Sequence, residues 1–336
     1  MVNQQRGSQS YKRPSRTAKS LVLLLIWLAL VGLLLANRQN ILDWWQLRGY
    51  QPPASVAQVA GADGLSAYAR KVFYVNHPNI DEKSSFTKFC PNNGGEHTIV
   101  LGCYHSNQRG IDLLSVADPR LNGVEQVTAA HEMLHAAYDR LSSKDRQYVD
   151  GLLNDYYRHN LDDQRVKDLI GVYQRTEPND LVNEMHSIFG TEIANLPPAL
   201  EAYYQRYFLN RSQIVAFATA YKTEFTSRQA AIKQYDVQLA DLKVQIDADE
   251  TDLRVKRATL DAQEKQLNQY KNSGNFAAHD ALVPTFNSLA NSFNTEADQL
   301  RALLKQYNQI VAARNAIVLE QEELNNEISS QVSPIN

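Results

Sequence analysis

The chain has 336 residues, a net charge of −3 and 43% hydrophobic residues, which is enough for one sizeable core and a second structural element. The small net charge gives no bulk electrostatic attraction to nucleic acid, and no basic patch follows the first twenty residues. We therefore expect no nucleic-acid partner.

The N-terminus combines a basic segment with an apolar one. Residues 1–20 contain five cations and no acid, and an apolar run covers residues 21–36. This pattern predicts a cytoplasmic tail at 1–20 and a transmembrane anchor at 21–37, with the bulk of the chain extracytoplasmic by the positive-inside rule. A cleaved signal peptide is the alternative, but the residues before a cut are poorly suited to cleavage, which favours an uncleaved anchor.

The segment after the anchor has the composition of a connection. Trp44 and Trp45 suit a membrane–water interface, and Pro52 and Pro53 end any helix that continues from the anchor. We expect residues 38–64 to be a juxtamembrane linker.

The two cysteines enclose a short loop. Cys90 and Cys103 are the only cysteines in the chain, and in an extracytoplasmic compartment we expect them to form a disulfide bond. Two buried thiols are an alternative, because an even count alone proves little. A metal site that adds His105 is a further alternative, although the pair lacks close Cys-x-x-Cys spacing.

Residues 65–210 read as a chain of short elements around a small sheet, so the fold class is α+β and mostly α. The patterns predict, in order, a helix at 65–74, strands at 98–104 and 111–116 joined by a turn at 106–110, and helices beginning near residues 124, 142, 162, 180 and 197.

The last third of the chain changes character. Apolar residues recur at spacings of three and four in two runs, which the segment 272–275 separates. Two heptad segments joined by a short turn predict an antiparallel coiled-coil hairpin over residues 211–336. The alternative is that these helices pack back on the globular part as an ordinary bundle.

Residues 131–135 spell H-E-x-x-H inside a stretch that should be helical. Residues four apart lie on one face of a helix, so His131 and His135 can reach one metal ion. Glu132 would then lie beside a water molecule bound to that ion. No Gly or Pro lies between residues 124 and 141, and the flanks are apolar. The alternative is a helix with two hydrogen-bonded histidines and a surface glutamate.

A catalytic zinc site needs a third protein ligand. Glu184 is the best candidate, because it is an acid within an otherwise apolar helical stretch, and a buried carboxylate there needs a positive partner. If Glu184 faces solvent instead, His186 becomes the rival ligand. The two residues lie about 200° apart around the helix, so both cannot face one ion.

His131, Glu132 and His135, followed by Asn183 and Glu184 on a later helix, resemble the zincin metallopeptidases of the gluzincin type. The resemblance covers about residues 65–210. It implies a zinc ion held by both histidines and Glu184, Glu132 as the general base, and a substrate cleft lined by the strand at 111–116.

The chain departs from this family at several positions. Where thermolysin-like members carry an Asp that orients a zinc histidine, this chain has Ile188, so we expect Ser187 or Asp139 to take that part. A third histidine of the metzincin kind is absent from residues 136–153. The candidates for stabilising the oxyanion are His186, Tyr203 and Tyr204.

These observations together predict a single-pass membrane protein with an extracytoplasmic zinc endopeptidase domain and a helical hairpin. Its substrate would be a peptide or protein. The alternative is a non-catalytic surface scaffold that binds a protein partner through the coiled coil.

Overall fold

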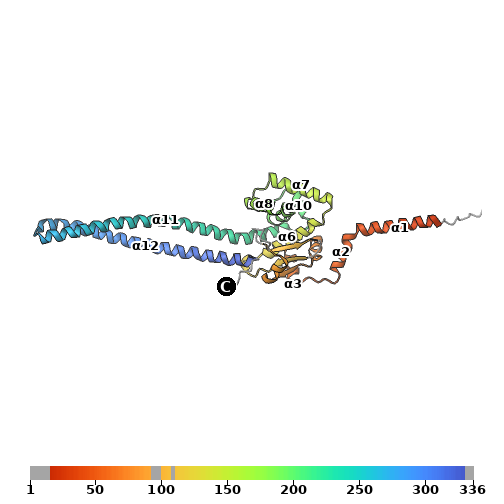
Figure 1. Cartoon of the computed structure of the whole chain (residues 1–336), viewed down its shortest axis with the longest axis horizontal. Helices are drawn as coiled ribbons and strands as arrows, with labels where there is room; N and C mark the ends of the chain where they lie inside the picture. The colour runs from red at the N-terminus through yellow and green to blue at the C-terminus, as the bar shows by residue number, and fades with distance from the viewer. Residues whose placement is uncertain (1–15, 92–99, 107–109, 330–336) are drawn as a thin grey trace, which may run out of the picture.

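The computed structural model describes residues 16–91, 100–106 and 110–329. The chain is α+β and mostly helical, with a small mixed sheet, which confirms the expected fold class. Figure 1 shows a globular domain in the middle, helix α1 on one side of it and a long two-helix arm on the other. The expected turn at 106–110 and the loop between the cysteines lie largely outside the described residues.

From residue 65 onward the predicted helices and strands are present. The helices are α1 (Arg16–Ala36), α2 (Arg38–Leu47), α3 (Ala54–Ala62), α4 (Ala67–Tyr74), α5 (Lys83–Phe89), α6 (Val124–Asp139), α7 (Ser143–His159), α8 (Gln164–Thr176), α9 (Leu181–Glu192), α10 (Pro198–Tyr204), α11 (Arg211–Asn272) and α12 (Phe276–Ile328), with a 3-10 turn η1 (Pro119–Leu121). The strands are β1 (Asn79–Asp81), β2 (Gly102–His105) and β3 (Gly110–Leu114). The sequence does not predict β1, α5 or η1.

The sheet has the order β1-β3-β2. Strand β1 runs parallel to β3, and β2 runs antiparallel to it, with Gly102 opposite Leu113. The two expected strands are therefore neighbours, as predicted. Strand β3 occupies the centre and its side chains are almost all buried, so β2 lies at an edge of the described sheet.

Helix α6 is the centre of the core, between the sheet and a lobe made of the following helices. Figure 1 shows α7, α8 and α10 on one side of α6, and the sheet with α3 on the other. Four alanines of α6 are fully or almost fully buried, and small side chains let neighbouring elements approach closely. These alanines are Ala129, Ala130, Ala136 and Ala137.

Residues 38–64 are not the linker that their composition indicates. They form α2 and α3, and Val56 and Ala60 of α3 are completely buried in the main core. The short Ala- and Val-rich segment has too weak a periodicity to reveal this burial, which depends on contact with β1 and α6.

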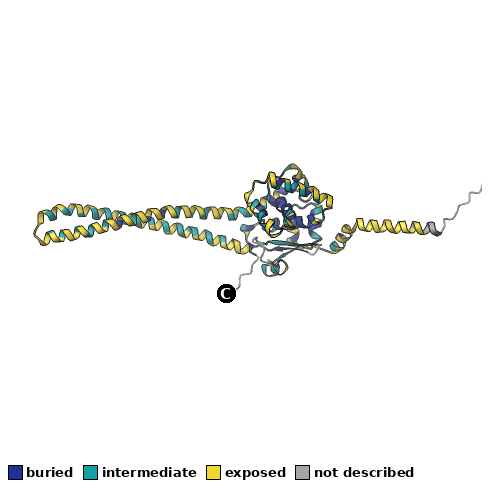
Figure 2. Ribbon diagram, turned by 45° about the horizontal axis from the view of Figure 1, so that its top comes forward, coloured by how far each residue is buried: buried dark blue, intermediate teal, exposed yellow. Residues whose placement is uncertain are grey.

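The arm consists of the long antiparallel helices α11 and α12, joined at the expected turn around residues 273–275. Figure 2 shows that most of its surface is exposed, in contrast with the buried interior of the globular domain. At 62 residues, α11 is on the order of 90 Å long. The first turns of α11 belong to the core, however, because Ile214 and Ala218 are fully or almost fully buried there. The expected domain boundary at 210/211 thus falls where the core continues.

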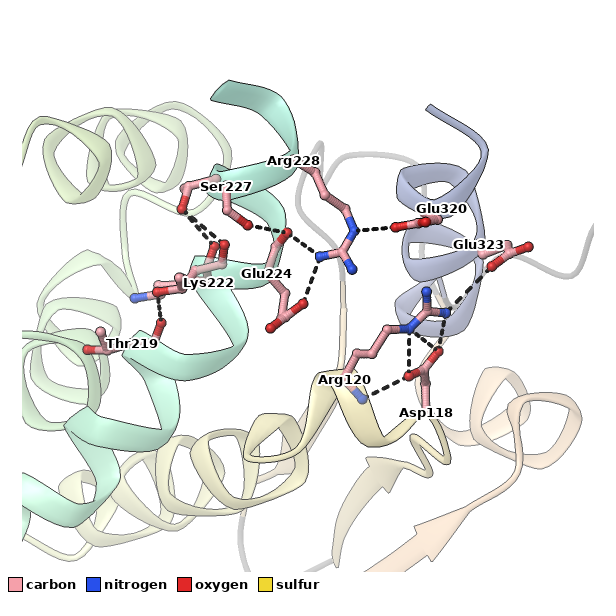
Figure 3. A network of polar contacts seen from close by, with 11 residues as sticks. Asp118, Arg120, Thr219, Lys222, Glu224, Ser227, Arg228, Glu320 and Glu323 are labelled. Atoms are coloured by element: carbon pink, nitrogen blue, oxygen red, sulfur yellow. Dashed lines mark hydrogen bonds and ion pairs between the residues drawn. The ribbon is translucent and has the colours of Figure 1, made fainter. Parts of the chain in front are cut away.

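The base of the arm contacts the globular domain through an ion pair that belongs to a small network of charged residues, as Figure 3 shows. Arg120 of η1 pairs with Asp118 at 2.6 Å and with Glu323 of α12 at 3.5 Å. Arg228 of α11 joins Glu320 of α12 at 3.3 Å. An apolar cluster that includes Leu324 and Ile328 of α12 lies nearby. The arm therefore leaves the domain from a packed root.

Helices α1 and α2 contain the apolar N-terminal segment of the chain. Among the described residues, no single helix is long and apolar enough to cross one. The segments Leu23–Ala36 and Arg38–Leu47, with a bend of 59° between them, are together long and apolar enough for a membrane span, by length and composition alone.

We predict that truncation after Phe208 prevents folding of the globular domain, because it removes Ile214 and Ala218 from the core. Shortening the arm should be tolerated. The ion pair between Asp236 and Arg314 at 2.8 Å marks where the two arm helices face each other, so a Gly-Ser turn joining residues 238 and 312 preserves the root.

Thermal unfolding followed by circular dichroism tests both shortened forms of the chain. The shortened chain should unfold cooperatively within a few degrees of the full chain, whereas the truncated chain should show no cooperative transition. A cooperative transition in the truncated chain would show that the core does not need α11.

Candidate metal centre

Helix α6 places the two histidines of the motif on one face. The Nε2 atoms of His131 and His135 lie 3.0 Å apart, and both residues are largely buried. The helix begins at Val124, as the sequence indicates, and its apolar flanks bury it on the other faces. Two nitrogen donors therefore point to one spot at the surface of the core.

Helix α9 brings a carboxylate to the same spot. Glu184 has one oxygen 3.4 Å from Nε2 of His135 and the other 3.6 Å from Nε2 of His131. The approach depends on Gly190, where a Cβ atom would lie 2.6 Å from Cδ1 of Leu134 and 2.7 Å from Cε1 of Tyr204. Only glycine lets α9 pass so close to α6.

The three side chains fit a metal ion. At Zn–N and Zn–O distances near 2.1 Å, tetrahedral ligands are about 3.4 Å apart. The two histidine Nε2 atoms are 3.0 Å apart, and each lies at a similar distance from one oxygen of Glu184, 3.4 Å from Oε1 for His135 and 3.6 Å from Oε2 for His131. All three donor atoms lie within 4.8 Å of one another. Oε2 of Glu184 is buried without a hydrogen-bond partner among the described residues, which leaves it available to a cation. The nitrogen and oxygen donors suit zinc.

The charge of Glu184 is maintained against its burial. Burial raises the pKa of this carboxyl group, but His135, His131 and a hydrogen bond with Tyr173 outweigh it, and the net pKa is lowered. The carboxylate is therefore ionised at neutral pH, as a metal ligand must be. Tyr173 belongs to α8, so three helices meet at the site.

Glu132 lies beside the centre and under the edge strand β2. It is 7% exposed and lines the same cleft as the histidines. A Cβ atom at Gly102 of β2 would lie 3.0 Å from Oε1 of Glu132 and 2.6 Å from Cγ2 of Thr128. The absence of a side chain at residue 102 makes the space that the Glu132 carboxylate occupies.

The centre opens into a cleft of about 1080 Å³ between the sheet and the helical lobe. Its sheet side is residues 100–106, and its opposite side includes Leu169 and Tyr173 of α8 and Asn183 of α9. The expectation that the strand at 111–116 lines the cleft is wrong. That strand is β3 in the middle of the sheet, and the edge strand β2 takes its place.

The structure does not bring His186, Tyr203 or Tyr204 into the cleft. His186 is completely buried on the far face of α9, where its Nε2 lies 2.9 Å from the Tyr203 hydroxyl. Tyr204 donates a hydrogen bond of 2.6 Å to the His186 carbonyl. Burial lowers the pKa of His186 to about 3, which keeps the imidazole neutral. These residues form a packed aromatic group behind the centre, so His186 is not a rival ligand here.

The expected orienting residues also lie elsewhere. Ser187 is completely buried, and its hydroxyl has no hydrogen-bond partner among the described residues. Asp139 lies at the exposed rim of the cleft, and no hydrogen bond of the described residues links it to a histidine. Ile188 lines the cleft wall. Tyr173 of α8 instead forms a hydrogen bond with Glu184.

The cysteines form the expected disulfide bond. Cys90, at the end of α5, is joined to Cys103 of β2, with Cα atoms 6.0 Å apart. Both sulfurs also lie close to His105 and Asp112, but the disulfide engages them, so the alternative metal site is not formed. His105 instead bonds Asp112 at 3.0 Å. The disulfide holds the edge strand next to the centre.

Two residues of the centre escaped the sequence analysis, Tyr173 and Gly102. Tyr173 resembles the other tyrosines of this region in its surroundings, and nothing local distinguishes it. Gly102 lies in a short strand where a glycine more often weakens the pairing. A glycine within a strand does signal a close approach, and that is the one cue the sequence offered.

The sequence matches no protein-family model. It also matches no curated protein and no solved structure. The interpretation of the centre therefore rests on its residues and their geometry.

We predict that Glu184→Gln lowers zinc affinity by at least roughly tenfold, because an amide is a poorer ligand than a carboxylate at a metal site. Asp180→Asn is the matched control, since Asp180 is exposed in the same cleft at the start of the same helix. Competition with a chromophoric chelator measures both affinities. Equal affinities in the two variants would remove Glu184 from the ligand set.

We predict that Gly102→Ala lowers turnover more than zinc affinity. The added methyl group meets Glu132 and Thr128, and overpacking of this kind costs about 1–3 kcal/mol. Zinc affinity and peptide hydrolysis are measured on the same sample. If hydrolysis is unchanged, β2 does not hold the Glu132 carboxylate in position.

Proposed function

We propose that the chain is a membrane-anchored, extracytoplasmic, zinc-dependent peptidase. The observation that carries the proposal is the convergence of His131, His135 and Glu184 from two helices, with Glu132 in the same cleft. A chance cluster of histidines and acids would lie on the exposed surface, with no reason for a glycine where the two helices cross. This cluster is largely buried, and Gly190 lies at the crossing.

The residues divide into ligands and a base. His131, His135 and Glu184 would hold the zinc ion, which supplies Lewis acidity and lowers the pKa of water toward 7. Glu132 accepts the proton of the attacking water at its carboxylate and delivers it to the leaving nitrogen. Tyr173 keeps Glu184 in place through its hydrogen bond.

The edge strand β2 supports a peptide as the substrate. It lines the cleft along residues 102–105. An extended peptide that lies along β2 in this cleft would present its carbonyl groups along the strand. The closeness of Gly102 to Glu132 would bring one such carbonyl near the base.

The membrane part of the proposal rests on the N-terminus. The basic residues before the apolar run favour a cytoplasmic tail and an extracytoplasmic domain, and the disulfide bond suits that compartment. In α1, the side chains of residues 20, 21 and 23–36 are exposed, as expected of an apolar helix whose surroundings are lipid.

We predict that Glu132→Gln retains zinc and loses hydrolysis of an unstructured protein by roughly two orders of magnitude or more, the usual worth of a general base. Asp139→Asn changes a carboxylate at the rim of the same cleft and should keep most of the activity. Zinc content is measured by elemental analysis and hydrolysis by release of labelled peptides.

Two results contradict the proposal in different ways. Full activity of the Glu132→Gln chain would remove Glu132 as the base. A wild-type chain that binds no zinc and cleaves nothing would favour the alternative, a surface scaffold that acts through its arm.

A further inference from the structure

Helix α2 exposes a large apolar face beside the globular domain. Ile41 and Leu42 are 39% and 41% exposed, and Trp44 and Trp45 are 58% and 66% exposed. At 100° per residue these four side chains cover an arc of about 160° on one side of the helix. Two exposed tryptophans on a ten-residue helix are a costly surface in water.

The opposite side of α2 is tied to the domain by a buried ion cluster. Asp43 is 2% exposed, and its carboxylate lies 2.8 Å from Arg140 and 2.7 Å from Lys71. Gln39 donates a further hydrogen bond of 3.0 Å to the same carboxylate. Arg140 follows α6 and Lys71 belongs to α4, so two core helices hold the polar side of α2.

A second contact secures the end of α2. Nε2 of His77 lies 2.8 Å from the carbonyl oxygen of Gln46, and the ring of Tyr50 stacks on His77 with centroids 4.3 Å apart. Helix α2 is therefore a fixed part of the globular domain, and its apolar face has one orientation relative to the core.

We propose that α2 lies along the surface of a phospholipid bilayer, with Ile41, Leu42, Trp44 and Trp45 in the headgroup region. Tryptophan prefers this region, and an amphipathic helix of this kind lies in its plane. Only Asn37 separates α2 from the exposed apolar helix α1. The inference rests on the membrane attachment in the proposed function and not on peptidase activity.

Charge supports a lipid surface as the partner. Arg48 lies over the ring of Trp44, 5.4 Å from its centroid, and Arg38 begins the helix. A guanidinium group thus stands at each end of the apolar face, where it can meet phosphate groups.

The ion cluster distinguishes a surface helix from the second half of a broken membrane span. Insertion of α2 into hydrocarbon would pull Asp43 away from Arg140 and Lys71 or carry all three charges into lipid, and both are expensive. With the cluster intact, the apolar face alone can enter the bilayer. Because Asp139 lies at the rim of the cleft beside Arg140, the cluster would also fix the catalytic helix relative to the membrane.

The test uses the full chain carrying Trp27→Phe, which leaves Trp44 and Trp45 as its only tryptophans. The chain is reconstituted in vesicles of phosphatidylcholine with a minor fraction of phosphatidylglycerol. Separate samples contain lipids brominated near the headgroup or near the chain end. We expect bromines near the headgroup to quench the emission at least roughly twofold more, because an interfacial helix enters only about 5–10 Å.

Either of two results overturns the proposal. Stronger quenching by the deep bromines would mean that α2 is part of a span, and no quenching by either lipid would mean that the face does not contact the bilayer. A chain that does not float with the vesicles gives the second result.

A second variant tests the role of the ion cluster. Asp43→Asn, added to Trp27→Phe, should keep the shallow quenching but increase amide hydrogen exchange in α2 by at least tenfold. Asp280→Asn, at the far end of the arm, is the matched control and should leave both unchanged. Unchanged exchange in the Asp43 variant would show that the cluster does not hold the helix, and the argument against insertion would fail.

Discussion

The close approach of α6 and α9 is the constraint on which the candidate centre depends. Gly190 makes it possible, since any larger side chain would collide with Leu134 and Tyr204. The approach turns one face of α9 toward the histidines, with Glu184 between them and Tyr173. The same geometry places His186 on the opposite face of α9, where it contacts Tyr203. The crossing of α6 and α9 thus places Glu184 on the side of the histidines and His186 on the side of the core.

Burial decides what this centre can do chemically. Two imidazoles and a carboxylate, all with little exposure, would each lose hydration on folding. Because the three groups face one another, their mutual interactions compensate for part of the lost hydration. A divalent cation among them would bind both nitrogens and the carboxylate together. The open side faces a cleft with Glu132 on its wall. Among the described residues no fourth ligand joins these three, which is the arrangement that the proposed catalytic role requires.

The sequence predicted the parts of the molecule whose signals are local. The period of α6, the motif within it, an acid in the apolar run of α9 and the heptads of the arm each lie within one segment. Contacts between distant segments were beyond it. Strand β1 has only three residues and depends on its pairing with β3. Helix α3 has the composition of a linker, and only its contact with α6 shows that it belongs to the core. Tyr173 matters because of its hydrogen bond to a residue of another helix.

The root of the arm is part of the globular domain that carries the centre, although its sequence suggests a separate unit. Glu192, at the end of α9, is held by Lys222 of α11 and by Arg165 of α8 at 2.6 Å. Burial raises the pKa of Glu192, but these two cations outweigh it and keep the carboxylate ionised. Tyr221 of α11 and Ile328 of α12 line the cleft. The root of the arm is therefore a wall of the cleft, and the ion pair between Lys222 and Glu192 joins it to α9, the helix that carries Glu184.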